Sequence, residues 1–453
     1  MTVFSSGPRR FGPLLCAAAL LGGASAQGAE PPLTDFLAAL AGHPELLAAG
    51  AGLEAARLQL SATRDPVALT ATGAYNRIDL DDALTAAQAP TDPGDGAGAS
   101  IPSQTGYTAS AGLVFRPFAY GELADTLTQL EVDLQTSELD FRTAQAGLEA
   151  RALEAALQLR LAERSTELSA AGVAAAEDGL AATRLRAERG AANDRELREA
   201  EAALLEARTL SQNAQLDTES ARLNLQSLVG DTLPPGETAL AALQPPAVQT
   251  PVSVAQAELQ TRLAALPLGA VRRSLLPVAS ASYSYNVSDY SSVSAAINSS
   301  TLQPQVGFSY QDPARTLPES AVDGVLSLSL SANISLGSID ALAAAERQGV
   351  AAEASLRAAR EGGTLQETAL RAAYTKADRD AELERRTFQN AQTSYEENVT
   401  RQELGLAAPL ETRTALIELL QADLERRTAE LTELGALLDL YELYALPPSE
   451  TLR

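Results

Sequence analysis

Residues 325–335 read VLSLSLSANIS, and this stretch has the clearest strand pattern in the chain. Leucine, alanine or isoleucine alternates here with serine or asparagine, which is the period of a β-strand with one apolar and one wet face. At Ile339 a run of helix-forming residues begins that reaches Leu404 without a proline. A short two-faced strand leading into so long a helix predicts a mixed α and β fold.

Similar strands are expected elsewhere in the chain. Residues 69–76 and 107–116 alternate in the same way on either side of a Gly/Pro/Asp-rich loop at 89–103, so 67–118 is predicted to be a hairpin. Residues 278–287 alternate serine with alanine and tyrosine, which places the second set of strands within 276–336.

Helices are expected before and after each set of strands. One helix is expected over Leu33–Thr63 and a second over 119–189, which would measure about 105 Å at a rise of about 1.5 Å per residue. After a break at Gly190, Asn193 is expected to cap a returning helix over 193–229. The following ranges complete the division: a Pro-rich linker 231–251, a helix 252–274, long helices 339–404 and 409–444, and a tail 447–453.

The two halves, 27–230 and 252–446, show the same order of elements. Gly190, Glu196 and Ala200 precede Gly405, Glu411 and Ala415 by 215 positions each. A shared Ala/Glu-rich composition explains part of this match, but not the common order of short helix, strands, long helix, break and returning helix. An internal duplication is therefore predicted.

The N-terminal end predicts export. Arg9 and Arg10 precede an apolar run, and small residues at 24–26 suit cleavage, so residues 1–26 are interpreted as a signal peptide. The single cysteine, Cys16, lies within it. The chain carries a net charge of −24, which disfavours nucleic acid as a partner.

The composition gives little support for an enzyme. One histidine, His43, and no cysteine beyond the signal leave few routes to a catalytic triad or a transition-metal site. His43 is interpreted as structural. No cofactor, metal or enzymatic activity is predicted, and an enzyme would need a carboxylate pair that the sequence does not single out.

Strands with one apolar and one hydroxyl-rich face suit a membrane β-barrel, with an ordinary soluble hairpin sheet as the alternative. Aromatic residues in the strands are expected at the membrane interfaces: Tyr75, Tyr107, Phe115, Tyr283 and Tyr285. Each half must cross an even number of times, so residues 303–310, which also alternate, are assigned to an extracellular excursion. Four strands per chain cannot close a barrel, whereas three chains would supply twelve.

Several short motifs resemble the TolC-like outer-membrane factors of efflux pumps and type I secretion. His43-Pro44-Glu45-Leu46 resembles that family's Asn-Pro-x-Leu, and Leu276-Pro277 its helix-to-strand junction. Residues 116–121 (RPFAYG) resemble its strand-to-helix turn, and the glycines at 190 and 405 resemble its two periplasmic tips. Departures are His43 for Asn, Ala407-Ala408-Pro409 in the second tip, and the additional segment 303–310.

The resemblance implies a homotrimer in which a 12-stranded outer-membrane barrel continues into a long α-helical periplasmic barrel. It implies a passive exit duct that works with a periplasmic adaptor and an inner-membrane pump or ABC transporter. Residues expected at the docking tips are Arg189, Gly190, Ala191, Leu404, Gly405 and Leu406.

Glu196 and Glu411 are candidate pore-lining acids that would favour cations. Acids in a first helical turn also simply favour the helix dipole, and the tip glycines also fit plain helix-hairpin chemistry. The alternative to a duct is a periplasm-spanning tether with a coiled-coil stalk.

Overall fold

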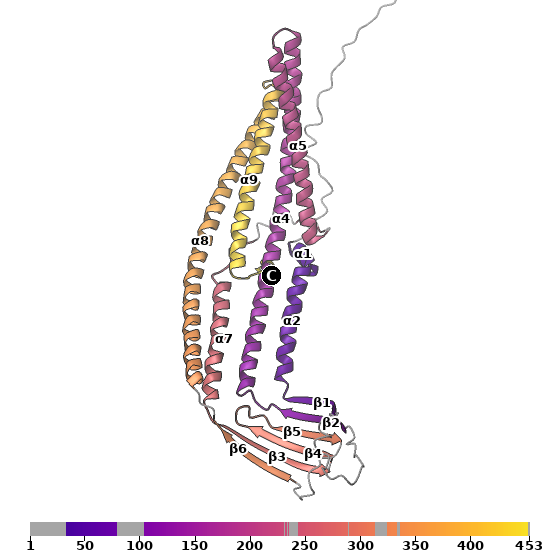
Figure 1. Cartoon of the computed structure of the whole chain (residues 1–453). Helices are drawn as coiled ribbons and strands as arrows, with labels where there is room; N and C mark the ends of the chain where they lie inside the picture. Colours follow the sequence, from indigo (N-terminus) through magenta and orange to yellow (C-terminus); the bar gives the residue numbers. More distant parts are fainter. Residues whose placement is uncertain are drawn as a thin grey trace, which may run out of the picture.

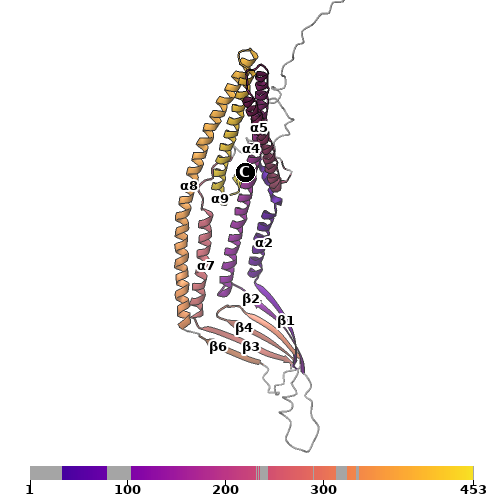
Figure 2. The same cartoon turned by 45° about the horizontal axis from the view of Figure 1, so that its top comes forward.

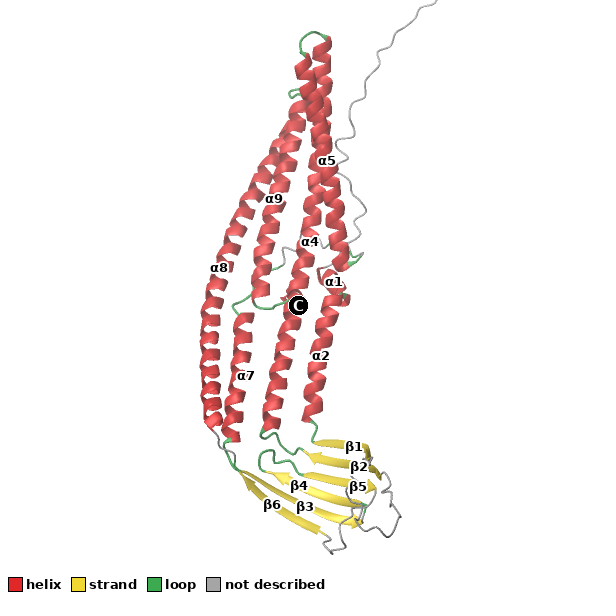
Figure 3. Cartoon of the chain, viewed as in Figure 1, coloured by secondary structure: helices red, strands yellow, loops and turns green. Residues whose placement is uncertain are grey.

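The computed structural model describes residues 33–78, 104–230, 232, 234, 243–288, 290–312, 324–332 and 336–451. It consists of a long helical bundle with one sheet at its end (Figures 1 and 3). The predicted signal peptide, residues 1–26, lies outside the described residues, as does the whole of the loop predicted at 89–103.

The helices of the first half are α1 (Leu33–Ala38), the 3₁₀ turn η1 (Ala39–Gly42), α2 (Pro44–Arg64), α4 (Glu122–Glu188) and α5 (Asp194–Val229). Those of the second half are α7 (Val252–Ser274), α8 (Leu336–Glu403), α9 (Pro409–Leu443) and α10 (Pro448–Thr451). The predicted long helices are thus confirmed to within a few residues at each end.

Two full-length helices, α4 and α8, run from the sheet to the far end of the bundle. In Figures 1 and 2, α2 and α5 lie one above the other beside α4, and α7 and α9 do the same beside α8. The two halves meet where α4 contacts α7 and α9. Just above the sheet, α2, α4, α7 and α8 therefore lie side by side as one row.

The single helix expected over Leu33–Thr63 is wrong, because the chain breaks at His43. The α1–η1 segment and α2 meet at a bend of 68°. Pro44 lacks an N–H and disfavours a helical conformation at the preceding residue, and His43 is extended with φ −68° and ψ 136°. The His43 Nδ1 accepts a 3.4 Å bond from the Glu45 N–H, so this histidine caps α2.

The sheet has six antiparallel strands in the order β1-β2-β5-β4-β3-β6. Their bounds are β1 Val67–Ile78, β2 Gln104–Phe115, β3 Val278–Ser288, β4 Ser291–Asn298, β5 Gln305–Asp312 and β6 Gly324–Ser331. The predicted hairpin within 67–118 is confirmed as β1 and β2.

The assignment of residues 303–310 to an excursion is wrong, because β5 lies in the middle of the sheet. It is bonded to β2 on one side and to β4 on the other. The strand β4 was not expected, and with it the second half has four strands. The number of strands in each half stays even, but the described part of the chain has six strands rather than four, so the count of twelve for three chains no longer follows.

The main hydrophobic core lies midway along the bundle, where α1, η1, α4, α5 and α9 meet. Phe36, Leu40, Leu148, Leu153 and Tyr441 are almost fully buried in it. The Tyr441 hydroxyl donates to the Gln244 carbonyl at 2.8 Å, which fixes the described end of the Pro-rich linker. The predicted C-terminal tail folds back as α10, where the Ser449 N–H donates to the Glu149 carboxylate at 2.8 Å.

A buried ion cluster around Asp423 joins three helices. Asp423, on α9, is 6 % exposed and accepts bonds from Arg426 at 2.6 Å and Arg427 at 3.1 Å. The Arg164 guanidinium, on α4, lies 3.3 Å from the same carboxylate. The Arg426 guanidinium stacks 5.0 Å above the Phe388 ring of α8. Burial alone would raise the pKa of Asp423, but bonds and charge from Arg426 and Arg427 outweigh it and hold that pKa below its ordinary value.

We expect Asp423→Asn to lower the free energy of unfolding at pH 7 by about 3 kcal/mol, because it removes the buried carboxylate charge that Arg164, Arg426 and Arg427 share. A carboxyl with a lowered folded pKa stabilises the fold above its unfolded pKa, near 3.8, and this contribution is lost as pH falls below that value. Denaturant unfolding followed by circular dichroism at pH 7 and at pH 3 measures both effects.

The matched control is Asp380→Asn, which makes the same change at an exposed position of α8. It should alter stability by no more than about 0.5 kcal/mol. Equal losses in the two variants would show that the cluster does not hold the helices together.

Candidate functional site: the helix tips and the sheet faces

The two helix tips have the same backbone geometry. Gly190 ends α4 with φ +71° and Gly405 ends α8 with φ +72°, a conformation that glycine adopts without strain. In each tip the N–H of the glycine donates to the carbonyl three residues earlier at 2.9 Å, and the next N–H donates to the carbonyl five residues earlier at 2.7 Å. This is the Schellman motif, in the same form at two sites 215 positions apart.

The predicted tip residues are all exposed. They are Arg189, Gly190, Ala191, Leu404, Gly405 and Leu406. Leu404 and Leu406 are each 69 % exposed, so the second tip presents two leucines to solvent within one turn. Behind them a small apolar cluster of Tyr395, Ala415 and Leu419 packs α8 against α9. An apolar surface on a rigid support is typical of a protein-docking site.

The predicted acids differ in their surroundings. Asn193 caps α5 as expected, since its Oδ1 accepts the Glu196 N–H at 2.9 Å. The Glu196 carboxylate lies 3.7 Å from the Arg186 guanidinium, so its charge is partly balanced within the tip. Glu411 is exposed and has no ion pair within the described part of the chain. Whether either acid faces a lumen stays a prediction.

One contact that the sequence did not predict joins the two hairpins near their tips. Arg413, on α9, donates to the Ala174 carbonyl of α4 at 2.9 Å and pairs with the Asp178 carboxylate. The partners lie 235 to 239 positions apart, so no local sequence pattern could reveal the contact. It ties the end of the second half to the first.

The sheet separates its side chains into two faces. The strand registers place Leu69, Leu113, Val306 and Phe308 on one face, continued by the leucines of β6. Leu328 and Leu330 there are 74 % and 75 % exposed. The other face carries hydroxyls, as shown by the direct pairs Thr72–Ser110 at 2.5 Å, Ser292–Ser309 at 2.8 Å and Ser280–Ser329 at 2.6 Å. Within the described strands, the registers place no acidic or basic residue on the hydroxyl face.

The predicted interface aromatics share the apolar face. Tyr75 is opposite Tyr107 near the helix-distal edge, and Phe115 is at the helix-proximal edge. Tyr283 and Tyr285 continue the row on β3, and Tyr290 stacks on Tyr310 with ring centroids 6.4 Å apart. Aromatic rings at both edges of an apolar band are typical of membrane-interface girdles, and their role here stays a prediction.

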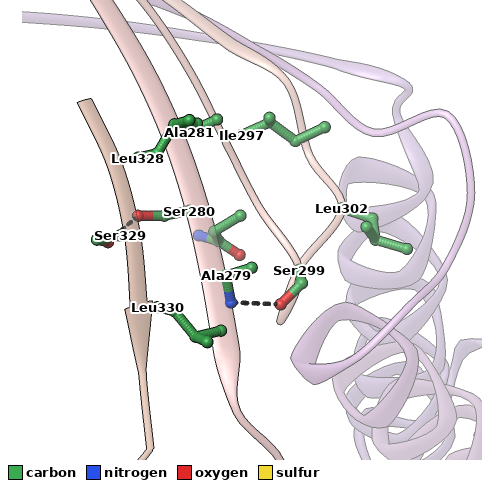
Figure 4. Close-up of a pocket in the computed structure, with 10 residues that line it drawn as sticks. Ala279, Ser280, Ala281, Ile297, Ser299, Leu302, Leu328, Ser329 and Leu330 are labelled. Atoms are coloured by element: carbon green, nitrogen blue, oxygen red, sulfur yellow. Dashed lines mark hydrogen bonds between the residues drawn. The ribbon is translucent and has the colours of Figure 1, made fainter. Parts of the chain in front are cut away.

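A shallow hollow of about 450 Å³ lies where β3, β4 and β6 approach the turn after β4 (Figure 4). Ala279 and Ala281 form its floor, and Ile297, Leu302 and Leu328 surround them. Because Ala279, Ala281, Ile297 and Leu328 belong to the apolar face of the sheet, the hollow lies on that face.

Among the described residues there is no group of three or more His, Cys, Asp or Glu side chains placed to hold a metal ion. Those same residues contain no single helix that is both long and apolar enough to cross a membrane. One bent pair, Leu33–Gly42 with Pro44–Arg64, passes that test together by length and composition.

Comparison with known proteins agrees with this geometry. Residues 37–231 match the sequence model of the outer membrane efflux protein family. No curated protein matches the chain.

Three solved structures share the fold over most of the chain. The CmeC outer membrane channel of Campylobacter jejuni is 14% identical, with 93% of this chain and 87% of that chain covered and a TM-score of 0.59. VceC of Vibrio cholerae is 15% identical, with 92% and 96% covered and a TM-score of 0.58. The open-state MtrE channel of Neisseria gonorrhoeae is 18% identical, with 92% and 89% covered and a TM-score of 0.58.

The family match covers most of the first half of the chain, and the structural matches cover nearly the whole chain. Residues 37–231 thus match the outer membrane efflux protein family in sequence, and nearly the whole chain has the fold of these outer membrane channels.

Proposed function

We propose that three copies of this chain form a passive exit duct for efflux or type I secretion across the outer membrane and the periplasm. The sheets of the three copies close into a barrel, and the helices continue it as a tunnel. A periplasmic adaptor docks at the tips, and an inner-membrane pump or ABC transporter supplies the energy.

The observation that carries this proposal is the separation of the sheet into an apolar face and a hydroxyl face. In a soluble protein, helices would cover the apolar face of such a sheet. Here the helices instead lie beyond one end of the strands (Figure 2). Exposed leucines on one side and unpaired edge strands on both flanks suit a closed barrel in lipid.

The helical bundle supports the same proposal through its length and its tips. At about 1.5 Å per residue, α4 and α8 each reach roughly 100 Å, far longer than a compact domain requires. The two tips present identical turns, with exposed leucines on the second. The matching order of elements in the two halves also supports an internal duplication, which would give three chains six similar hairpins around the tunnel.

The rival function is a structural tether with a coiled-coil stalk. Both proposals need the trimer and the long helices, but the duct alone needs an open lumen. Single-channel recording from the purified trimer in planar bilayers separates them. Discrete conductance supports the duct, whereas silence that continues after both tips are truncated supports the tether.

For adaptor docking, we expect the double variant Leu404→Glu/Leu406→Glu to abolish efflux, because it replaces the apolar surface of the second tip with charge while leaving the Gly405 turn intact. A bulky or charged residue at Gly405 itself should have the same effect. Accumulation of a dye in cells that carry the variant as their sole copy gives the readout.

Trimer formation, measured by cross-linking in the same cells, should be unchanged. The control Leu365→Glu replaces a leucine that is 72 % exposed on α8 far from the tip, and it should leave efflux intact. Normal efflux in the double variant would remove the docking role from this tip.

For the candidate pore acids, we expect Glu196→Gln/Glu411→Gln to reduce cation preference, measured as the reversal potential across a KCl gradient. Glu411→Gln alone should account for most of the change, because Arg186 already balances part of the Glu196 charge. Glu361→Gln, an exposed acid on α8 far from the tips, serves as the control. A reversal potential unchanged in the double variant would place both acids away from the lumen.

A further inference from the structure

The hairpin formed by β4 and β5 is inserted between two strands that would otherwise be neighbours. β1 and β2 adjoin α2 and α4, while β3 and β6 adjoin α7 and α8, so these four strands follow the same spatial order as the row of helices. The hairpin separates β2 from β3, beneath the contact of α4 with α7.

Both sides of this hairpin are fully paired. Eight residues of β5 are bonded in register to β2, from Tyr107↔Asp312 to Val114↔Gln305. On the other side, β4 pairs with β3 from Ser280↔Asn298 to Ser288↔Ser291. A surface loop would not satisfy its backbone groups on both flanks, so β4 and β5 are strands of the wall.

The hairpin also carries the two faces of the rest of the sheet. Val293 and Ile297 of β4, with Val306 and Phe308 of β5, continue the apolar face, and each is between 37 % and 46 % exposed. On the opposite face the Ser292 hydroxyl bonds that of Ser309 at 2.8 Å. A hairpin folded into the lumen or out into water would expose the apolar row to water.

The turn after β4 is hydrogen-bonded to both neighbouring strands, β3 and β2. The Asn298 Oδ1 accepts the Thr301 N–H at 2.9 Å and shapes the turn. The Ser299 hydroxyl accepts the Ala279 N–H at 2.9 Å (Figure 4), and the Pro304 carbonyl accepts the Phe115 N–H at 2.9 Å. Gly121, with φ +62°, lies so close to this turn that an added Cβ would clash with the Ser300 carbonyl oxygen.

We propose that this hairpin widens the barrel, so that three chains close it with eighteen strands, β1 of one chain pairing with β6 of the next. The inference rests on the proposed trimeric duct. Eighteen strands spaced about 4.8 Å apart and tilted by about 35–45° give a perimeter of roughly 105–120 Å. Twelve strands give roughly 70–80 Å.

The helices offer an independent measure of the same perimeter. Four helices per chain, α2, α4, α7 and α8, form the row above the sheet, and twelve helices at about 8–10 Å spacing need roughly 95–120 Å. The wider barrel therefore continues the tunnel without narrowing. Along the described strands, the face that would line its lumen carries hydroxyl groups and no charged side chain.

Electron cryomicroscopy of the full-length trimer in lipid nanodiscs tests this count. Eighteen strands per trimer, with β5 between β2 and β4, is the expected result. A trimer with twelve strands in the wall and the hairpin displaced would overturn the widening and leave the duct intact. Failure to find three chains around a lumen would instead refute the duct.

Deleting residues 290–312 tests the role of the hairpin directly. Ser288 and Gly324 both lie at the helix-distal edge, so the remaining loop still joins β3 to β6 and each chain keeps four strands. This variant should assemble as a trimer whose barrel diameter is about two-thirds of the original, because diameter grows roughly linearly with strand number. An unchanged diameter would overturn the proposal.

If the deletion variant does not fold, a second variant tests whether the turn after β4 packs against Gly121. In the full chain, Gly121→Ala should lower the melting temperature of the trimer, through the positive φ and the clash with Ser300. In a chain with Ser300 to Leu302 replaced by a shorter Gly-Gly turn, the loss should be smaller. The same loss in both backgrounds would show that the turn does not rest on Gly121. Gly172→Ala, in open space on α4, is the control.

Discussion

Backbone hydrogen bonding at the two edges of the sheet is the constraint on which the assembly depends. Within the described chain, β1 and β6 are each paired on one side alone. In lipid, an unpaired row of N–H and C=O groups costs several kcal/mol per group, so a sheet with an apolar face can enter a membrane only if its edges close. Six twisted strands cannot close on themselves, and copies of the chain must complete the wall. In the proposed duct, this requirement is met by neighbouring copies of the chain, whose sheets close around a lumen.

The long helices extend over roughly 100 Å. Backbone conformation and hydrogen bonds fix the turn at each of their ends. Near the sheet, α4 begins directly after a glycine that adopts a positive φ, and at the far end Gly190 and Gly405 reverse the chain with identical bonds. Midway, the Asp423 cluster and the core around Tyr441 join the two halves. Stability is therefore concentrated in the middle of the bundle, which leaves the exposed tips available for contact with a partner.

Much of this was readable from the sequence, because the deciding signals are local. Period-two alternation predicted β1, β2, β3 and β6. The glycines at 190 and 405 predicted the two tips, and Asn193 predicted the cap of α5. The break at His43 was missed although Pro44 signals it. The segment 303–310 has a strand pattern, but it was assigned to an excursion so that each half would have an even number of strands. The even number is instead reached with β4, which was missed because its sequence SSVSAAIN alternates weakly. The Arg413–Asp178 pair joins residues 235 positions apart, and only the folded arrangement brings them together.

The most direct test of the account is cysteine accessibility along β3 in trimers reconstituted in a planar bilayer, in a background in which Cys16, the single cysteine, is replaced. Single cysteines at Ser280, Ser282 and Ser284 are compared with cysteines at Ala281, Tyr283 and Tyr285, using a charged, membrane-impermeant thiol reagent. The account predicts that the serine positions react and reduce the current, while the alternate positions do not. Reaction without period two, or a reaction confined to the tyrosine and alanine positions, would contradict a water-filled duct lined by the hydroxyl face.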